Sequence, residues 1–544
     1  MRSDSTKLIQ SGLLLTLLFL TACESDDKTS CIPATAPAPL AASTPAPVIT
    51  SMGTDFFLTL PDHLCVSAPA ICRNIPVTNK LTVAAATATT GDVTFNGVIT
   101  PFSVAAGGQA VITLDPAVVL TSNELIEAKA IHVTSLAPVS VHVVSETYYS
   151  ADGYLALPTA GLGTRYYVMA YSSTRYTGSE FAVVATQNNT TVTITPKADG
   201  ATRKAINGAF TVMLNSGQTY QFANTAFADM TGSLVTADKP VAVFGGHRCA
   251  DVPSATVNYC DYLVEQLSDV SIWGKTHHTA LFSGRSRYTV RVLASQDGTT
   301  FTTAPTGMIS TLNAGQFADV IMDVIMTGTG EFVSNNPVLV AQYVHGYTDD
   351  AAGKGDPSMV MVTPAEHGIA DATFGVHGLP GTPINGAFMN VVTETAALAN
   401  LKLDGAVVSP VFFTPVSGAS IYSVGTIPIS PGAHSLLGTV PYSALVYDYG
   451  VGSNMISYAY PVAATLSLPV PAPVTTPPPV NTPPAACMAD VNAGGEQIHA
   501  HSGDGGNARN DIHIHHDDDG HHHDDGHHDD EGHHDDDDGL AHHT

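Results

Sequence analysis

Four residues with metal-binding or catalytic side chains lie within fifteen positions of one another. They are His247, Cys249, Cys260 and Asp261, in the segment KPVAVFGGHRCADVPSATVNYCDYLVEQL that spans residues 239–267. Imidazole, thiolate and carboxylate groups are ligands that tetrahedral zinc accepts. The usual Cys-x-x-Cys spacing of zinc sites is absent, however, and thiols of an exported chain oxidise. We therefore favour a disulfide between Cys249 and Cys260, which closes a loop of about ten residues, over a zinc site.

A second set of possible metal ligands lies in the C-terminal tail, residues 497–544. Fourteen His occur between His499 and His543, and they alternate with runs of Asp. Imidazole suits Zn, Ni and Cu, and His-rich tails bind these ions above about pH 6.5, where the rings are neutral. The tail has almost no apolar residues, so we expect it to be disordered; a merely solvated acidic tail is the alternative. The predicted metal ligands are His513, His515, His516, His521, His522, His523, His527, His528, His533, His534, Asp524 and Asp529.

The N-terminal residues have the order of a bacterial lipoprotein signal. Arg2 and Lys7 flank the start of the apolar run LIQSGLLLTLLFL, and the tetrapeptide LTAC ends at Cys23. The run is too short for a comfortable membrane span. We expect residues 1–22 to be a signal peptide and Cys23 to be lipidated. An ordinary signal peptide with an incidental cysteine is the alternative. The membrane partner would then be the outer membrane, with the protein exposed at the surface or facing the periplasm.

Six cysteines remain once Cys23 is set aside, and an even number in an exported chain indicates disulfides. Two pairs are close in sequence, Cys65–Cys72 and Cys249–Cys260. The third predicted pair, Cys31–Cys487, would join the two segments that flank the body of the chain.

Composition limits the classes of partner. The 544 residues include only 20 Lys and Arg, and charged residues make up 12%. The formal net charge is −28, and roughly half of it lies in the last thirty-five residues. No basic patch is apparent, so nucleic-acid binding, which requires phosphate neutralisation, is not expected.

Between two Pro-rich segments the chain repeats itself about every hundred residues. Each unit contains a Gly turn, as in LNSGQTYQF and LNAGQFADV, and a Val-rich strand, as in DKPVAVFGG and NNPVLVAQY. Such periodicity predicts tandem structural units. The expected organisation after the signal peptide is a lipidated cysteine with a Pro/Ala/Thr-rich stalk (23–53), four β repeats (54–152, 153–260, 261–358 and 359–466), a Pro-rich linker (467–496) and the tail (497–544).

The fold class follows from the pattern within each unit. Short runs alternate apolar and polar residues with a period of two, they are bounded by turn residues, and no long helical period occurs. We therefore predict an all-β chain of four tandem β-sandwich-like repeats. A closed ring of four β blades is the alternative.

The segment described first also carries a family resemblance. The KPVAVF strand, the pair Cys249 and Cys260, the run CDYLVEQ and the WGK that begins at Trp273 resemble the N-terminal domain family of IgG Fc-binding protein. The segments YLALPTAGLGTRYYVMAYS and SEFAVVATQNNTTVTITP resemble it as well, so that the similarity covers roughly residues 54–460. The resemblance implies surface binding without a defined set of binding residues, and it implies no catalytic activity.

The sequence contains no GxSxG or HExxH motif, so we do not expect an enzyme. Glu265 is a conceivable catalytic acid, but a structural hydrogen-bonding role near Trp273 is favoured. We predict a lipid-anchored envelope protein that acts as a non-enzymatic adhesion or ligand-binding module, with a glycoprotein or glycan as partner. It would need no cofactor. The alternative is a metal-capture or buffering protein in which the tail binds Zn, Ni or Cu and the repeats are a scaffold.

Overall fold

The computed structural model describes residues 48–326, 328–350, 352–379, 386–418, 420–450 and 455–467. These residues form thirty β-strands and only one short α-helix, with eight short 3-10 helices. The prediction of an all-β chain with four β-sandwich-like repeats is confirmed. Across the part of the chain so described, none of the helices has the length and hydrophobicity that a membrane crossing requires.

One long strand organises each repeat. These four strands are β7 (Ile131–Glu146), β14 (Leu234–Ala250), β21 (Thr329–Val344) and β29 (Gly432–Tyr449). Each pairs with one set of strands through its first half and with another set through its second half, so that it joins two sheets.

A proline marks the point where each long strand changes sheets. Pro138, Pro240, Pro337 and Pro441 lie between the two halves, next to the register shifts. Because proline has no N–H to donate to a ladder, it is tolerated where pairing is interrupted. The four prolines therefore mark one equivalent position in all four repeats.

The remaining strands are arranged alike around these long strands. The first repeat contains β1 (Gly53–Leu58), β2 (Thr78–Ala85), β3 (Thr89–Phe95), β4 (Val98–Val104), β5 (Gly108–Thr113), β6 (Ile126–Glu127) and β8 (Ala151–Leu155). The second contains β9 (Gly163–Tyr167), β10 (Ser179–Ala185), β11 (Thr190–Thr195), β12 (Phe210–Leu214), β13 (Thr219–Ala223) and β15 (Asp261–Leu267). The third contains β16 (Gly274–Ala280), β17 (Arg287–Ala294), β18 (Thr299–Ala304), β19 (Ile309–Leu312), β20 (Phe317–Asp323) and β22 (Ser358–Met361). The fourth contains β23 (Ile369–Val376), β24 (Ala387–Glu394), β25 (Lys402–Leu403), β26 (Ala406–Val407), β27 (Phe413–Pro415), β28 (Tyr422–Ile429) and β30 (Ser457–Pro461).

The first five strands along each sheet path follow the same order in all four repeats; the second sheet adds β6, which precedes it in sequence and pairs with β13, and the fourth adds β27 beside β28. In the third, the path is β19-β18-β21-β17-β20, with β16 beside the first half of β21 and β22 beside its second half. All pairings between these strands are antiparallel. The helices lie in the connections: α1 (Leu64–Ser67), η1 (Pro116–Val118), η2 (Thr159–Gly161), η3 (Ala205–Asn207), η4 (Val270–Ile272), η5 (Val324–Met326), η6 (Ala365–His367), η7 (Thr395–Asn400) and η8 (Pro410–Phe412).

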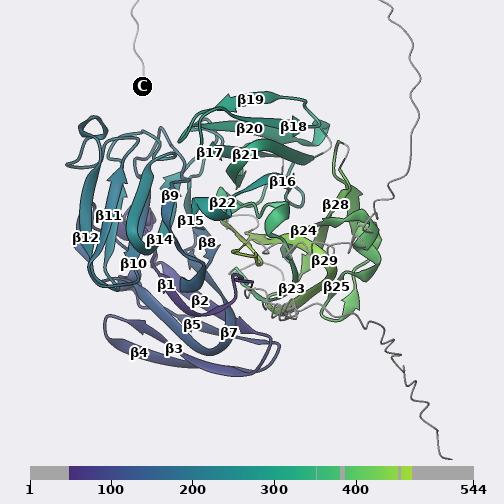
Figure 1. Cartoon of the computed structure of the whole chain (residues 1–544), viewed down its shortest axis with the longest axis horizontal. Helices are drawn as coiled ribbons and strands as arrows, with labels where there is room; N and C mark the ends of the chain where they lie inside the picture. Colours follow the sequence, from purple (N-terminus) through teal and green to yellow (C-terminus); the bar gives the residue numbers. More distant parts are fainter. Residues whose placement is uncertain are drawn as a thin grey trace, which may run out of the picture. The chain divides into compact units, whose positions relative to one another are not determined.

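The four sandwiches follow one another around a common centre, as Figure 1 shows by the change of colour from purple to yellow-green. The last strand of each repeat lies at this centre; we call β8, β15, β22 and β30 the closing strands. Each closing strand packs on the next, and β30 packs on β8. The four repeats thus combine the predicted sandwich architecture with the closure of the alternative ring arrangement.

Each hydrophobic core includes residues of the following repeat. The core of the first repeat includes Phe244 and Tyr262 of the second, and the core of the second includes Tyr343 of the third. The core of the third includes Tyr447 of the fourth, and the core of the fourth includes Val144 of the first. Burial of apolar surface is the main force that stabilises such packing, so the closed arrangement is held by four shared cores.

The sequence-based repeat boundaries at 152/153, 260/261 and 358/359 fall at the closing strands. Segments such as YLALPTAGL and YLVEQLSDV were assigned to the start of the following repeat. In the structure, β8 pairs with β7 and β15 pairs with β14, so each completes the preceding sheet. The recurring Gly turns are placed as expected, since Gly217 and Gly315 have the positive φ angles (78° and 73°) that favour glycine.

Candidate binding site

The closing strands all run from one end of the ring to the other. Ser150, Cys260, Asp356 and Met455 precede them at one end, where they line a single pocket. Their last residues, among them Leu155 and Met361, line a different cavity at the other end. The two ends therefore have different surroundings and different chemistry.

The pocket at the starting end has a volume of about 720 Å³, which is within the usual range for small-ligand sites. Four of its lining residues are tyrosines, and we call it the tyrosine pocket. It is lined by Leu64, Cys65, Ile71, Cys72, Arg73, Tyr148, Tyr149, Ser150, Arg175, Tyr176, Cys249, Asn258, Tyr259, Cys260, Asp356 and Met455.

Two disulfides form part of the pocket wall. Cys65 is bonded to Cys72 and Cys249 to Cys260, with Cα–Cα distances of 5.3 and 5.1 Å. Both local pairs expected from the sequence are thus present in the structure. In each loop a buried histidine precedes the first cysteine by two residues and accepts its backbone N–H through Nδ1: His63 from Cys65 at 3.1 Å, and His247 from Cys249 at 2.9 Å.

The zinc alternative for this segment does not fit the structure. Cys249 and Cys260 have no free thiolate because they are bonded to each other. Burial lowers the pKa of His247 to about 3, and its Nδ1 is occupied by the Cys249 N–H. Among the described residues, no group of three or more His, Cys, Asp or Glu is placed to hold a metal ion.

The turn between β7 and β8 presents two of the tyrosines. The Thr147 N–H donates to the Ser150 carbonyl at 2.8 Å, which closes the turn and leaves Tyr148 and Tyr149 at its tip. Their rings meet edge to face with centroids 4.8 Å apart. The guanidinium of Arg73 lies over the Tyr149 ring, 5.0 Å from its centroid, a distance at which a cation and an aromatic face attract.

The loop closed by Cys249–Cys260 presents another exposed tyrosine, Tyr259. Tyr259 has a φ of 74°, which is unusual for a bulky residue. Its ring meets Tyr347 of the third repeat edge to face, with centroids 6.1 Å apart. The loop is further held by hydrogen bonds from Asn258 N to Thr348 Oγ1 at 3.0 Å and from Gly346 N to the Val252 carbonyl at 2.8 Å.

The two arginines of the pocket are in different situations. Arg175 donates through Nη2 to the Ala255 carbonyl and to Asn258 Oδ1, both at 2.9 Å, so it braces the same loop. Arg73 is exposed and forms no salt bridge with any described residue. Asp356, the acidic residue of the lining, is buried and accepts the Tyr347 N–H at 3.0 Å. Burial raises the pKa of Asp356 well above its usual range, which disfavours its negative charge.

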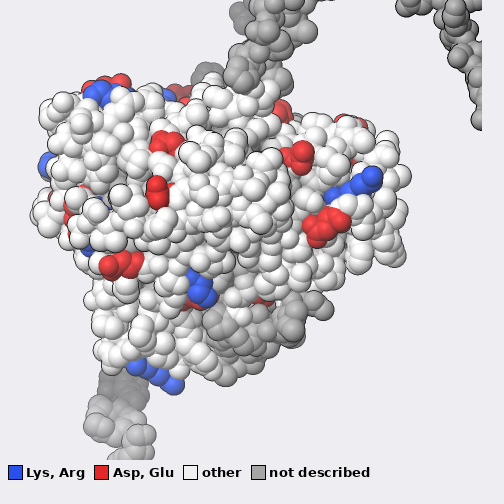
Figure 2. Space-filling model, turned by 90° about the horizontal axis from the view of Figure 1, so that it is seen from below, with Lys and Arg blue, Asp and Glu red and all other residues white. Residues whose placement is uncertain are grey.

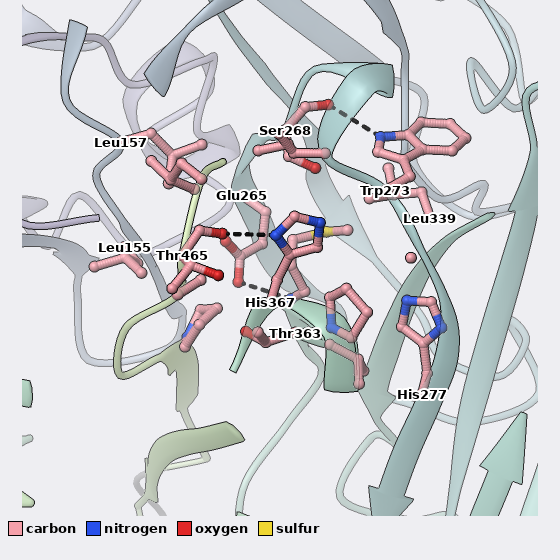
Figure 3. Close-up of a pocket in the computed structure, with 18 of the residues that line it drawn as sticks. Leu155, Leu157, Glu265, Ser268, Trp273, His277, Leu339, Thr363, His367 and Thr465 are labelled. Carbon is pink, nitrogen blue, oxygen red and sulfur yellow. Dashed lines mark hydrogen bonds between the residues drawn. The ribbon is translucent and has the colours of Figure 1, made fainter. Parts of the chain in front are cut away.

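The cavity at the opposite end is small and mostly apolar (Figure 3), with a volume of about 70 Å³. Glu265, Trp273, His277 and His367 surround it. Glu265 accepts the Met361 N–H at 3.1 Å, and Trp273 donates to the Ser268 carbonyl at 3.2 Å. Glu265 therefore has the hydrogen-bonding role near Trp273 that the sequence favoured, and this cavity is part of the core.

The described chain also begins and ends at this opposite end. Thr50 forms a β-bridge with Thr465, and Ser51 N donates to the Ala464 carbonyl at 2.8 Å. Thr465 lines the small cavity. Residues 48 and 467, the first and last that the structure describes, therefore lie at the end away from the tyrosine pocket.

Several predicted site residues lie outside the described residues. They are Cys23, Cys31, Cys487 and the whole set of metal ligands from His513 to His534. Sequence reasoning did not select Arg73, Tyr148, Arg175 or Tyr259. Arg73 and Tyr259 adjoin cysteines and Tyr148 lies in the YYS turn, but no signal in the sequence points to Arg175. The four residues are far apart in sequence, so their proximity could not be predicted.

Comparison with known proteins gives three kinds of similarity. A family model described as IgGFc binding protein matches residues 152–447, more than half of the chain. Human IgGFc-binding protein is 27% identical over 288 residues, which cover 49% of this chain and 5% of that protein. The chain thus spans only a small part of the length of this relative. The match begins at Asp152, so Arg73, Tyr148 and Tyr149 precede it.

Two solved structures of bacterial ice-binding adhesins were also found. One, described in work on host cell surface retention of a 1.5-MDa adhesin, is 10% identical and covers 59% of this chain and 98% of its own, with a TM-score of 0.11. The other, a Ca²⁺-stabilised adhesin with which an Antarctic bacterium binds ice, is 12% identical and covers 76% and 98%, also with a TM-score of 0.11. At such a score the likeness carries no argument about fold or function.

Proposed function

We propose, from the premise that this chain belongs to the IgGFc binding protein family, that it is a non-enzymatic binding module whose partner binds at the tyrosine pocket. The observation that carries the proposal is the pocket itself. Exposed tyrosines, the Arg73 guanidinium, which has no salt bridge with a described residue, and two disulfide-closed loops from different repeats converge on one volume of about 720 Å³. Tyrosine and arginine are the residue types that contribute most to binding energy at recognition surfaces.

The position of the chain ends supports a role at a cell surface. Residues 48 and 467 lie at the end of the ring opposite the tyrosine pocket. We propose that Cys23 is lipidated and that residues 23–47 form a stalk to the outer membrane; the predicted stalk extends to residue 53, but Thr50 and Ser51 pair with Thr465 and Ala464 and belong to the ring. With that arrangement the pocket is presented away from the membrane, toward an extracellular glycoprotein or glycan. Charged side chains are scattered on the face that Figure 2 shows, and the chain has only 20 Lys and Arg, which argues against nucleic acid as the partner.

Binding of a glycoprotein to pocket variants tests this function. The full chain, immobilised through an engineered tag, is compared with the variant Tyr148→Ala/Tyr259→Ala for binding of a mucin-type glycoprotein. Phe227→Ala is the matched control, because Phe227 is 52% exposed and lies outside the pocket. We expect at least tenfold weaker binding by the pocket variant and unchanged binding by the control. Equal binding by all three proteins would contradict the proposal.

The His- and Asp-rich tail supports a second, separable activity. We propose that residues 497–544 capture Zn²⁺, Ni²⁺ or Cu²⁺; the support for this is the density of His in the sequence. Imidazoles must be neutral to bind metal, so affinity is expected to fall as the pH decreases below about 6. Titration of Zn²⁺ into the full chain and into a chain that lacks residues 497–544 shows how much of the metal binding is due to the tail. Equal uptake by both would discard the tail as a metal-binding segment.

A further inference from the structure

The tyrosine pocket has features that select among classes of ligand. Two of its aromatic rings are solvent-accessible: Tyr148 is 42% exposed and Tyr259 is 47% exposed. Each is held from behind, Tyr148 by the ring of Tyr149 and Tyr259 by the ring of Tyr347. Rings that are already fixed lose little conformational entropy when a ligand stacks on them. Flat, pre-positioned aromatic faces suit the C–H face of a sugar ring.

The backbone at these positions also departs from ordinary conformations. Tyr259 and Arg73 have φ angles of 74° and 56°, in the left-handed region that costs energy for side chains with a Cβ. Both residues lie directly beside a disulfide-bonded cysteine. Neither side chain is buried in a core that would compensate for the cost. Unfavourable backbone that is maintained at exposed residues is characteristic of ligand sites.

The charge of the pocket favours an anionic ligand. Arg73 has its guanidinium over Tyr149 and no salt bridge with a described residue, so its N–H donors remain available to a ligand. The acidic group of the lining, Asp356, is 2% exposed and its carboxyl is engaged by the Tyr347 N–H. A guanidinium binds carboxylates and sulfates through two parallel N–H···O bonds. A free arginine beside aromatic faces is therefore suited to a sugar that carries an acid group.

We propose that the tyrosine pocket binds an anionic saccharide, with the acid group on Arg73 and the sugar ring on the exposed face of Tyr148 or Tyr259. The proposal rests on the function proposed above and specifies its ligand class. An acidic peptide is a less suitable occupant, because the described pocket wall consists of turns and loops apart from α1 (Leu64, Cys65) and the end of the paired strand β14 (Cys249), and main-chain pairing requires a free strand edge. Asn258 Oδ1 is bound by Arg175, but the Asn258 Nδ2 group and the hydroxyl of the exposed Tyr259 supply polar groups that a sugar's own hydroxyls require.

Calorimetric titration of the full chain with four probes tests the ligand class. The probes are 3′-sialyllactose, which carries a carboxylate; a sulfated chondroitin disaccharide; lactose, which is neutral; and an acidic decapeptide of glutamate. We expect at least one anionic saccharide to bind tenfold or more tightly than lactose. The comparison between the carboxylate and the sulfate probe identifies the acid group. Tighter binding of the decapeptide than of every saccharide would overturn the proposal.

Single substitutions test which residue binds the acid group of the ligand and which binds its sugar ring. Arg73→Gln is expected to reduce the preference for the anionic sugar over lactose to less than twofold. Tyr259→Ala is expected to weaken both sugars by tenfold or more. Arg203→Gln is the matched control, because Arg203 also lies over an aromatic ring, Phe210 at 4.2 Å, but outside the pocket. A preference that survives in Arg73→Gln would overturn the proposal.

Failure of this inference is distinguishable from failure of the proposed function. If glycoprotein binding is lost in Tyr148→Ala/Tyr259→Ala but no anionic saccharide is preferred, the pocket is a binding site for another class of ligand and only the present inference is wrong. If glycoprotein binding is unaffected by the pocket variants, the proposed function is wrong as well. Near-ultraviolet circular dichroism of each variant establishes that it is folded.

Discussion

Asp152 of the first repeat accepts the backbone N–H of Met359 of the third repeat at 3.1 Å. The same oxygen accepts Val264 N of the second repeat at 3.1 Å, and the other oxygen accepts Ala459 N of the fourth at 3.4 Å. One fully buried carboxyl group thus receives hydrogen bonds from the closing strands of all three other repeats. Asp152 is the polar link at the centre of the ring, and it keeps the ends of those strands in place around the tyrosine pocket.

Replacement of Asp152 by alanine is expected to destabilise the whole ring. It leaves three buried N–H groups without their acceptor, and each such group costs about 1–3 kcal/mol. We therefore expect the free energy of unfolding in urea to decrease by about 3 kcal/mol or more. Asp371→Ala, at an exposed position on β23, is the control and should change stability by less than about 0.5 kcal/mol. If Asp152→Ala also lowers the free energy of unfolding by less than about 0.5 kcal/mol, the stability of the ring does not depend on the hydrogen bonds to Asp152.

Glu265→Gln is expected to change how stability depends on pH. Burial raises the pKa of the Glu265 carboxyl well above its usual range. A raised pKa in the folded state means that the stabilisation is fully present below the unfolded pKa and is lost as the pH rises through the folded pKa. Glutamine keeps an acceptor for the Met361 N–H but does not titrate. The variant should gain stability relative to the natural chain as the pH increases from 4 to 8.

Urea unfolding at intervals of one pH unit measures this difference. Glu394→Gln, at a partly exposed position on β24, gives the background slope. A constant difference between Glu265→Gln and the natural chain across the range would refute the buried-acid explanation.

Arg291 links the second and third repeats, and its replacement by a neutral residue is expected to destabilise the folded protein. It pairs with Asp319 at 2.7 Å and with Asp229 at 2.8 Å, and it lies over the Phe317 ring at 4.0 Å. Arg291→Met leaves the carboxylates without their cation, so the free energy of unfolding should decrease by about 3–5 kcal/mol. Arg291→Lys should recover only part of this loss, because lysine lacks the planar fork. Full recovery by lysine would show that charge alone, and not the geometry of the guanidinium, is required.

Loss of the Cys249–Cys260 disulfide is expected to weaken both folding and binding. The variant Cys249→Ala/Cys260→Ala should lose about 2–4 kcal/mol of stability and bind glycoprotein at least tenfold more weakly, because Tyr259 is no longer held in its unusual backbone conformation. Loss of the Cys65–Cys72 bond, which is part of the same pocket wall but does not flank Tyr259, should weaken binding less. Parallel measurements of thermal unfolding and of binding at 20 °C compare the two pairs. An unchanged affinity in the first variant would mean that the loop conformation is irrelevant to binding.

The part of the fold that could be predicted from the sequence is the part encoded locally. Gly217 and Gly315 in their turns, and the Val-rich strands that follow Pro240 and Pro337, repeat with a fixed spacing, which is sufficient to predict β repeats. The pattern predicts β8 and β15 at the start of the following repeat, whereas each pairs with the long strand of the preceding repeat. A strand pattern indicates burial but not the strand with which it pairs. Ring closure depends on contacts such as Asp152–Ala459, and no local pattern indicates a contact between residues that distant.

The same limit applies to the candidate site. The cysteine pairs were predictable, since each pair is close in sequence and export indicates oxidation. The pocket was not, because Arg73, Tyr148 and Tyr259 come from separate loops that meet only when the ring closes. For His247 and Cys249 the residue types alone allow a zinc site, and the exported context favours the Cys249–Cys260 disulfide, which the structure contains.

The most direct test of the central claim is a map of which residues a glycoprotein partner protects. Hydroxyl-radical footprinting of the full chain, with and without a saturating mucin-type glycoprotein, reports the solvent access of tyrosine side chains. The account predicts protection of Tyr148 and Tyr259, with no change at Phe227. Protection confined to the outer strands, with Tyr148 and Tyr259 as reactive as in the free protein, would contradict it.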